Sequence, residues 1–222
     1  MSSAAEVVAH LESLRNEHNI AGMARFGIRP ARPLGISITT LRPLAKKLGH
    51  DHALSEALWA SGWHEARILA AFVEEPARVT RRLMDARAAA FDSWDICDQW
   101  CLSVFRRTPH AWAKARQWTS RRAAFVKRAG FSLFAVLAVH DRTADEAAFL
   151  DALALVEREA GDERNTVKKS VNWALRQIGK RDVRLRRAAI AAATRIAEQD
   201  SRAARWIAAD ALRELRRAPS AR

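Results

Sequence analysis

The chain has 222 residues, 49% of them hydrophobic, which is enough to bury a sizeable core and excludes wholesale disorder. Its 8 glycines and 6 prolines are too few for an all-β sandwich or barrel, and its longest uncharged stretch, residues 129–140, is far shorter than the ~20 residues of a membrane-spanning helix. The net charge of +13 favours a polyanionic partner such as nucleic acid.

Helical periodicity runs through almost the whole chain. In chain order, the predicted helices cover residues 3–18, 40–48, 52–61, 63–74, 77–89, 93–106, 110–118, 121–139, 144–160, 165–180, 183–199 and 203–217. An irregular segment, residues 27–38, holds Pro30, Pro33 and Gly35 and separates the first helix from the rest. The sequence Thr143-Ala-Asp-Glu146 matches a capping box for the 144–160 helix.

Short connections between these helices indicate antiparallel neighbours. Apolar segments around Arg128, Val171 and Ala208 recur at a spacing of about 40 residues, the period of HEAT-type helical pairs. We therefore predict an all-α protein, an α-solenoid of HEAT-like antiparallel helical pairs with a concave basic groove; an irregular helical bundle is the alternative. One domain is expected over residues 1–222, with an N-terminal helix and irregular segment at 1–38, helical repeats at 39–217 and a tail at 218–222.

The positive charge is confined to the second half of the chain. Residues 1–100 hold 12 basic and 12 acidic side chains, whereas residues 101–222 hold 26 basic and 13 acidic ones. Arginine outnumbers lysine 31 to 7, and its guanidinium group suits bidentate contacts with phosphate. The coding composition of the genome is an alternative explanation of this bias. The N-terminus has no signal-peptide pattern, and Cys97 and Cys101 suit a reducing compartment, so we expect a cytoplasmic protein.

The 165–180 helix has an aromatic side chain on its charged face. Its apolar stripe consists of Val167, Val171, Ala174, Leu175 and Ile178. Trp173 falls on the opposite side, with Lys169, Arg176, Gln177 and Lys180. This combination suits a polyanion that also offers a planar or cationic surface. The alternative is that another helix covers Trp173.

The 93–106 helix carries a tryptophan and a carboxylate four residues apart, Trp94 and Asp98, on the shoulder of its apolar stripe. A carboxylate in this position can form a structural ion pair with an arginine, or it can stabilise positive charge that develops in a reaction. The 121–139 helix is apolar nearly all round, with Arg121, Arg128 and Ser132 in one narrow stripe. A buried cation there needs a partner, either an internal acid or a phosphate. Other catalytic or metal-binding motifs do not stand out.

Three segments of the sequence resemble the AlkD-like DNA alkylation repair glycosylases. Phe91-Asp-Ser-Trp-Asp-Ile-Cys-Asp98 is similar to the family's Trp-Asp-x-x-Asp segment, and Phe125-Val-Lys-Arg-Ala-Gly130 is similar to its arginine-bearing helix. Val167-Lys-Lys-Ser-Val-Asn-Trp-Ala-Leu-Arg-Gln-Ile-Gly179 is similar to its second tryptophan helix. The order and spacing agree over roughly residues 20–217. Ser93 departs from the family, some members of which have an aromatic residue at this position.

The resemblance implies a DNA glycosylase that excises N3- and N7-alkylated purines, such as 3-methyladenine and 7-methylguanine, from duplex DNA in base excision repair. It implies a HEAT-like fold, no metal or organic cofactor, and a catalytic cleft formed by Asp98, Trp94 and Trp173. Arg128 matches the family's arginine for the DNA backbone. The further cations that we expect to bind DNA are Lys127, Lys168, Lys169, Arg176 and Lys180.

The family's chemistry is compatible with these residue types, because a carboxylate close to the sugar stabilises the oxocarbenium ion of glycosidic cleavage. Two alternatives remain open at this point: a HEAT-type protein scaffold and a non-catalytic binder of nucleic acid. We expect a monomer that does not bind membranes.

Overall fold

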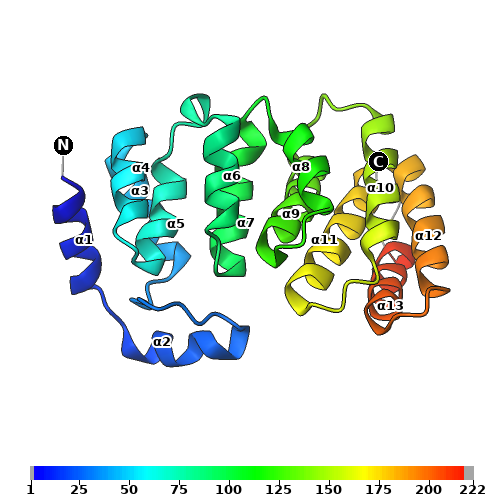
Figure 1. The fold of residues 1–222 in the computed structure, drawn as a ribbon, viewed down its shortest axis with the longest axis horizontal. Helices are drawn as coiled ribbons and strands as arrows, with labels where there is room; N and C mark the ends of the chain where they lie inside the picture. The colour runs from blue at the N-terminus through cyan, green and yellow to red at the C-terminus, as the bar shows by residue number, and fades with distance from the viewer. Residues whose placement is uncertain (1–2, 218–222) are drawn as a thin grey trace. The chain divides into compact units, whose positions relative to one another are not determined.

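The computed structural model describes residues 3–217, so the predicted tail at 218–222 lies outside the described residues. The chain divides into two compact units, residues 1–108 and 109–222, which are called here the N-terminal and C-terminal units. Residues 3–217 form thirteen α-helices and three short 3-10 helices and contain no strand (Figure 1). This confirms the all-α prediction, whereas the single domain stays a prediction. None of the helices in residues 3–217 combines the length and apolar character needed to cross a bilayer.

After its first helix, α1, the N-terminal unit forms a helical hook, which consists of α2 and the 3-10 helix η1 and lies across one end of the following helices (Figure 1). Its α-helices are α1 (Ala4–Ser13), α2 (Glu17–Met23), α3 (Ile38–Leu48), α4 (His52–Ala60), α5 (His64–Val73), α6 (Arg81–Ala89) and α7 (Trp94–Ser103). The 3-10 helices are η1 (Ala24–Phe26), η2 (Pro76–Arg78) and η3 (Phe105–Arg107). Within this unit, α5 packs against α3, α4 and α7.

The C-terminal unit is built around α9 and α11, which pack against each other. Its helices are α8 (Ala111–Thr119), α9 (Ala124–His140), α10 (Glu146–Glu159), α11 (Asn165–Arg181), α12 (Val183–Ala197) and α13 (Arg202–Arg217). Helix α9 also packs against α8, and α11 also packs against α12 and α13. Gly130 allows the close approach of α9 to α8, because a Cβ there would lie 2.9 Å from the Ala115 carbonyl oxygen.

Both apolar stripes predicted from the sequence are buried. Ile96, Cys97, Trp100 and Val104 form the core side of α7 and the residue after it, and Val167, Val171, Ala174, Leu175 and Ile178 form that of α11. In α9, residues 128–138 are all buried, as expected for a central helix. The sequence therefore identified the core faces of the three helices that carry the candidate site residues.

Several predicted boundaries were wrong. The predicted 121–139 helix begins only at Ala124, so Arg121 lies before α9 and not in one helical stripe with Arg128 and Ser132, and the predicted 93–106 helix ends at Ser103.

In three other cases, local caps compete with periodicity. The predicted 3–18 helix ends at Ser13, and the side chain of Asn16 accepts the Asn19 amide to start α2. The predicted 77–89 helix begins only at Arg81, because the side chain of Thr80 accepts the Leu83 amide and caps the helix there. Helix α10 is capped by Asp145 rather than by Thr143, whose hydroxyl instead donates to Asp141.

Candidate functional site

Trp94 is the first residue of α7 and lies half-buried against the hook of the N-terminal unit. Its indole Nε1 donates a hydrogen bond of 2.9 Å to the backbone carbonyl of Phe26 in η1. The hook therefore fixes the orientation of the Trp94 ring, although its residues lie 68 positions away in the sequence. Sequence analysis did not find this contact, because a backbone acceptor leaves no signature in side-chain patterns.

Asp95, the next residue, is committed to internal contacts. One carboxylate oxygen accepts from His64 Nε2 at 2.8 Å, and the other accepts from the Ile96 amide and the Ser93 hydroxyl. Burial by itself would raise the pKa of the Asp95 carboxyl, but the hydrogen bond and charge of His64 outweigh it together with Ser93 and Ile96, so the pKa is lowered. Asp95 is thus an ionised structural acid that joins α7 to α5.

Asp98 lies one helical turn after Trp94 on the same shoulder of α7. Both side chains are half-buried, and Cys97 and Cys101 beside them are buried cysteines that do not form a disulfide. The structure therefore brings together Trp94 and Asp98 as predicted, on a face bordered by the apolar core. A carboxylate in such surroundings interacts more strongly with a nearby positive charge than one in bulk water.

Arg128 of α9 is only 6% exposed, and its guanidinium holds two helices of the C-terminal unit together. Nη1 donates a hydrogen bond of 2.7 Å to the backbone carbonyl of Thr166 in the first turn of α11. This backbone carbonyl is a partner that the sequence did not predict. The acid or phosphate that the sequence led us to expect as a partner of Arg128 stays a prediction.

Lys127, the neighbouring cation, lies between two acids of the same unit. Its Nζ is 2.6 Å from Glu159 Oε2 and 3.2 Å from Asp162 Oδ2. Burial opposes ionisation of Asp162, but hydrogen bonds from Arg164 and Lys127 lower the pKa of this carboxyl to about 2. Contact of Lys127 with DNA stays a prediction, and such contact would require a phosphate to compete with these carboxylates.

Trp173 lies on the polar face of α11 and is half-buried, so no other helix of its unit covers it completely. Lys169, one turn before it, is exposed. Arg176, one turn after it, lies 3.2 Å from Asp210 and contacts Glu214 of α13, which also contacts Lys180. The predicted cationic face of α11 is therefore partly neutralised by α13, whose acids lie more than 30 positions away in the sequence.

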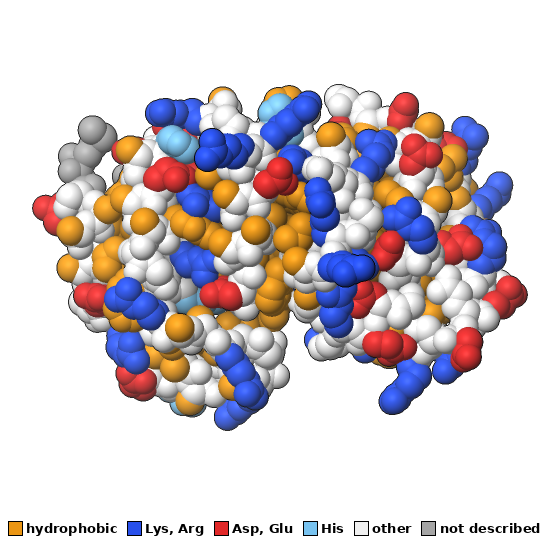
Figure 2. All heavy atoms as spheres, in the orientation of Figure 1, with side chains coloured by type: hydrophobic (Ala, Val, Ile, Leu, Met, Phe, Trp, Pro, Cys, Tyr) orange, Lys and Arg blue, Asp and Glu red, His pale blue; other side chains and the backbone are white. Residues whose placement is uncertain are grey.

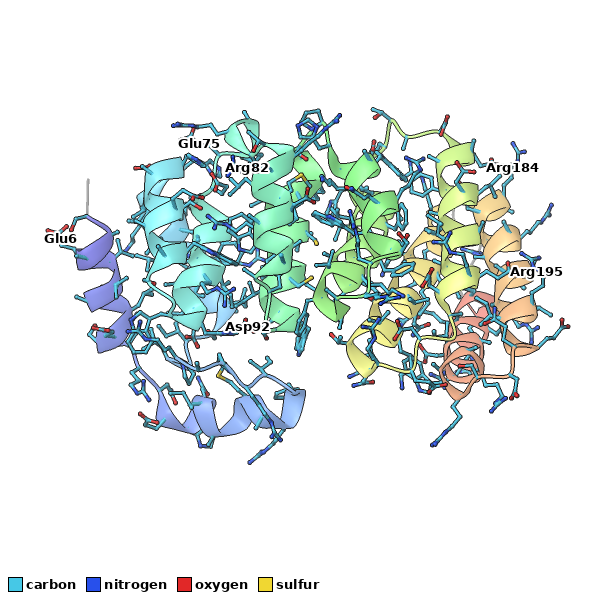
Figure 3. All side chains as sticks on the ribbon, viewed as in Figure 1. Glu6, Glu75, Arg82, Asp92, Arg184 and Arg195 are labelled. Carbon is cyan, nitrogen blue, oxygen red and sulfur yellow. The ribbon has the colours of Figure 1, made fainter. Side chains whose placement is uncertain are left out.

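Lys168 lies over the ring of Trp206 in α13, with Nζ 4.8 Å from the ring centroid. Trp206 is 42% exposed, and sequence analysis did not single it out as a site residue. Elsewhere in the unit, cations and acids are also interleaved (Figure 2). Arg184 and Arg195 point outward from α12 (Figure 3) and pair with Glu146 and Glu157 of α10.

The family model of the DNA alkylation repair enzymes matches residues 7–215. The chain belongs to this family. A solved structure described as a new family of proteins related to the HEAT-like repeat DNA glycosylases, with affinity for branched DNA structures, superimposes with a TM-score of 0.80. It is 19% identical, and the match covers 96% of this chain and 95% of that chain. No curated protein matches the chain.

The structural match shows that this DNA alkylation repair family member has the HEAT-like repeat fold, as the sequence predicted. Trp94 and Asp98 lie together on α7 of the N-terminal unit. Arg128, Lys169 and Trp173 lie on α9 and α11 of the C-terminal unit, which pack against each other. That α7, α9 and α11 line one concave basic groove stays a prediction.

One side-chain cluster of the family member has the composition of a metal site. Ligand atoms of His52, Glu56 and Glu74 lie within 4.8 Å of one another. However, Glu74 already accepts from His52 at 2.7 Å and from Ser55 at 2.9 Å, and Glu56 contacts the Arg87 guanidinium. A cation at this position disfavours a divalent metal. The cluster is better explained as a partly buried ion-pair network, and the absence of a cofactor stays a prediction.

Proposed function

We propose that this protein is a DNA glycosylase that excises N3- and N7-alkylated purines, such as 3-methyladenine and 7-methylguanine, from duplex DNA. The observation that carries the proposal is the pair of side chains that α7 presents one helical turn apart. Asp98 shares a half-buried face with the aromatic ring of Trp94. This pairing of an indole with a carboxylate suits a reaction whose transition state is positively charged.

Asp98 acts on the sugar in this proposal. A purine alkylated at N3 or N7 is cationic and is already a good leaving group. As its glycosidic bond lengthens, the positive charge moves to the sugar and an oxocarbenium ion develops. The carboxylate of Asp98 stabilises this ion electrostatically and orients the water that attacks it. Trp94 and Trp173 offer the electron-rich faces of their rings to the cationic nucleotide, and no metal or organic cofactor takes part.

The cations of α9 and α11 bind the DNA backbone in the same proposal. Lys169 is the most available of them because it is exposed, and Arg128 would act beside its bond to Thr166. The remaining candidates already have partners within the protein: Lys127, Lys168, Arg176 and Lys180. For Lys127, Arg176 and Lys180, phosphates must compete with carboxylates. We further propose a monomer that acts in the cytoplasm, where Cys97 and Cys101 stay reduced.

The test is release of free base from a duplex that has been methylated on its purines. The purified protein is incubated with this duplex and with an unmethylated duplex of the same sequence, and free 3-methyladenine and 7-methylguanine are separated and quantified. We expect time-dependent release from the methylated duplex above spontaneous depurination. Release at the spontaneous rate, at protein concentrations that saturate DNA binding, would refute glycosylase activity.

A second candidate is a non-catalytic binder of branched DNA. The similar solved structure is described as having affinity for branched DNA structures, and the excess positive charge of the C-terminal unit supports binding of DNA in either case. Gel-shift titration of a four-way junction against a linear duplex of equal length distinguishes the two candidates. Preference for the junction without base release favours the binder, and base release from the duplex favours the enzyme. A protein scaffold would show no salt-dependent binding of either the junction or the duplex.

A further inference from the structure

The N-terminal unit has an open pocket of about 400 Å³ that is lined by the C-terminal parts of α3, α5 and α7 and by η3. Part of its wall is apolar, and none of the described residues that line it is acidic. Its ionisable side chains are Arg42, Lys46, His50 and Arg107. The pocket is called here the basic pocket. Trp94 lies at the opposite end of α7, so the basic pocket is distinct from the candidate site.

The cations of the basic pocket lack acidic partners. Arg42, Lys46 and Arg107 are exposed, and among residues 3–217 none of them forms an ion pair. The carboxylate of Glu74, which follows α5, is occupied elsewhere, because it accepts hydrogen bonds from His52 and Ser55. The positive charge of the pocket is therefore not neutralised by the part of the chain that the structure describes.

A charged pocket of the C-terminal unit shows the contrast. It is lined by three arginines and two acids, and its Arg176 and Arg213 both pair with Asp210. The N-terminal unit does not lack acids for such pairing, since it has 14 basic and 12 acidic side chains. The unpaired cations of the basic pocket are thus a local feature and do not reflect an excess of charge over the whole unit.

Gathering these cations has a cost within the protein. Arg42 and Lys46 lie four residues apart on α3, and like charges at this spacing destabilise a helix. The helix dipole favours Lys46, which is in the last turn, but Arg42 lies one turn earlier. Burial lowers the pKa of the Arg106 guanidinium, and the charge of Arg107 lowers it further. An anion between these cations would relieve their repulsion.

Two contacts hold polar groups of the basic pocket in place. The Arg42 guanidinium carbon lies 5.2 Å from the centroid of the Phe72 ring, so a cation–π contact fixes it above α5. His50 Nδ1 donates to the Glu74 carbonyl oxygen at 2.9 Å, because a carbonyl only accepts. Guanidinium and ammonium groups bind phosphate oxygens by charge-assisted hydrogen bonds, and the Ser103 hydroxyl adds a neutral donor.

We propose that the basic pocket binds a phosphate group of DNA, with Arg42, Lys46 and Arg107 as its charged contacts. The N-terminal unit then has a phosphate contact of its own, in addition to the cations proposed for α9 and α11. The inference rests on the DNA partner of the proposed function. A phosphate of the backbone and a phosphate at a strand end offer the same oxygens, so the experiment must separate these two sources.

The test compares two double variants of the whole protein. Arg42→Gln with Arg107→Gln, the pocket variant, removes two cations from the basic pocket and keeps polar side chains there. Arg78→Gln with Arg82→Gln is the matched control, because both arginines are exposed in the same unit and neither lines the pocket. Affinity is measured by fluorescence anisotropy over a range of salt concentrations, for one unmethylated duplex with 5′-hydroxyl ends and for the same duplex with 5′-phosphates.

On the 5′-hydroxyl duplex, the pocket variant should lower the slope of log affinity against log salt concentration by roughly one unit, because one phosphate contact is lost. The control should leave the slope nearly unchanged. A decrease seen only with the 5′-phosphorylated duplex would assign the basic pocket to a terminal phosphate. Equal slopes for the two double variants on both duplexes would overturn the proposal.

A second measurement needs no DNA. Inorganic phosphate, added at constant ionic strength, should raise the melting temperature of the wild type and of the control but not that of the pocket variant. Without phosphate, the pocket variant should melt no lower than the wild type, since repulsion has been removed. The same response of all three proteins to phosphate would contradict the site. A pocket variant that melted well below the wild type would make the two arginines structural groups, and the proposal would fail.

The outcome is separable from that of the proposed function. Base release by the wild type, with equal slopes for the two double variants, would leave the glycosylase intact and reject the basic pocket. A slope that falls only in the pocket variant, without any base release, would keep the pocket and reject the glycosylase.

Discussion

The two units hold their candidate tryptophans in different surroundings. The N-terminal unit has 14 basic and 12 acidic side chains, and Trp94 is oriented by a neutral backbone carbonyl beside a carboxylate. The C-terminal unit has 24 basic and 13 acidic side chains, and Trp173 lies on the charged face of α11. Under the proposed function, the first unit supplies the local chemistry and the second attracts the polyanion over a distance.

The largest expected effect tests the chemistry assigned to the N-terminal unit. Asp98→Asn keeps the size of the side chain and removes its charge, so base excision should fall by ~10²-fold or more, the scale of losing one electrostatic stabiliser. Affinity for DNA should be unchanged or higher, because a negative charge is removed. Excision is measured under single-turnover conditions, and folding is checked by thermal melting.

Asp95→Asn is the matched control on the same helix. This variant removes the negative charge that faces His64, whose side chain is only 1% exposed. Its main effect should therefore be a lower free energy of unfolding. Full excision by Asp98→Asn would contradict the catalytic role of Asp98. A fall in its melting temperature as large as that of Asp95→Asn would instead identify Asp98 as a structural acid.

The next effect concerns the buried arginine of the C-terminal unit. Arg128→Ala leaves the Thr166 carbonyl without this donor, so the free energy of unfolding should fall by about 1–3 kcal/mol. Urea denaturation at neutral pH measures the change, and Arg121→Ala, at an exposed position just before α9, is the control. If both variants unfold at the same urea concentration as the wild type, the Thr166 contact contributes nothing measurable to the free energy of unfolding.

A smaller effect tests attraction of DNA by the C-terminal unit. Lys169→Ala should lower the slope of log affinity against log salt concentration by roughly one unit, because one phosphate contact releases about one counterion. Arg187→Ala removes an equally exposed cation from α12 and should leave the slope nearly unchanged. An equal decrease for both variants would indicate that only net charge matters and that α11 has no special place in binding.

The sequence predicted those features that depend on residues close in the chain. The core faces of α7, α9 and α11 follow from periodicity, and the pairing of Trp94 with Asp98 follows from helical spacing. It could not predict the Phe26 carbonyl that holds Trp94 or the α13 acids that neutralise Arg176, because these contacts depend on how distant helices pack. The capping box at Thr143 failed for another reason, since Asp145 competes for the same helix start.

A further test concerns the acid that holds Lys127. The pKa of Asp162 is lowered to about 2 in the folded protein, below the ordinary value of 3.8, so its ion pairs stabilise the fold above that ordinary value. This stability is lost as the pH falls through about 2. It amounts to about 1 kcal/mol after allowance for solvent screening. Asp162→Asn should therefore lower the melting temperature at pH 7 and have little effect at pH 2; an equal decrease at both values would contradict the ion pair.

The smallest expected effect tests whether acids of α13 restrain the cations of α11. Glu214 contacts both Arg176 and Lys180, whose proximity lowers the pKa of its carboxyl against the opposing effect of burial. Glu214→Gln removes this negative charge and leaves both cations available to phosphate, so affinity for duplex DNA should rise a few-fold, and the salt slope should steepen. Glu146→Gln removes an acid that pairs with Arg184 on the outer helix α12, and it controls for net charge. If both variants gain the same affinity, the gain is a long-range effect of net charge. A gain confined to Glu214→Gln would place the DNA backbone along α11, where the exposed Lys169 and the half-buried Trp173 also lie.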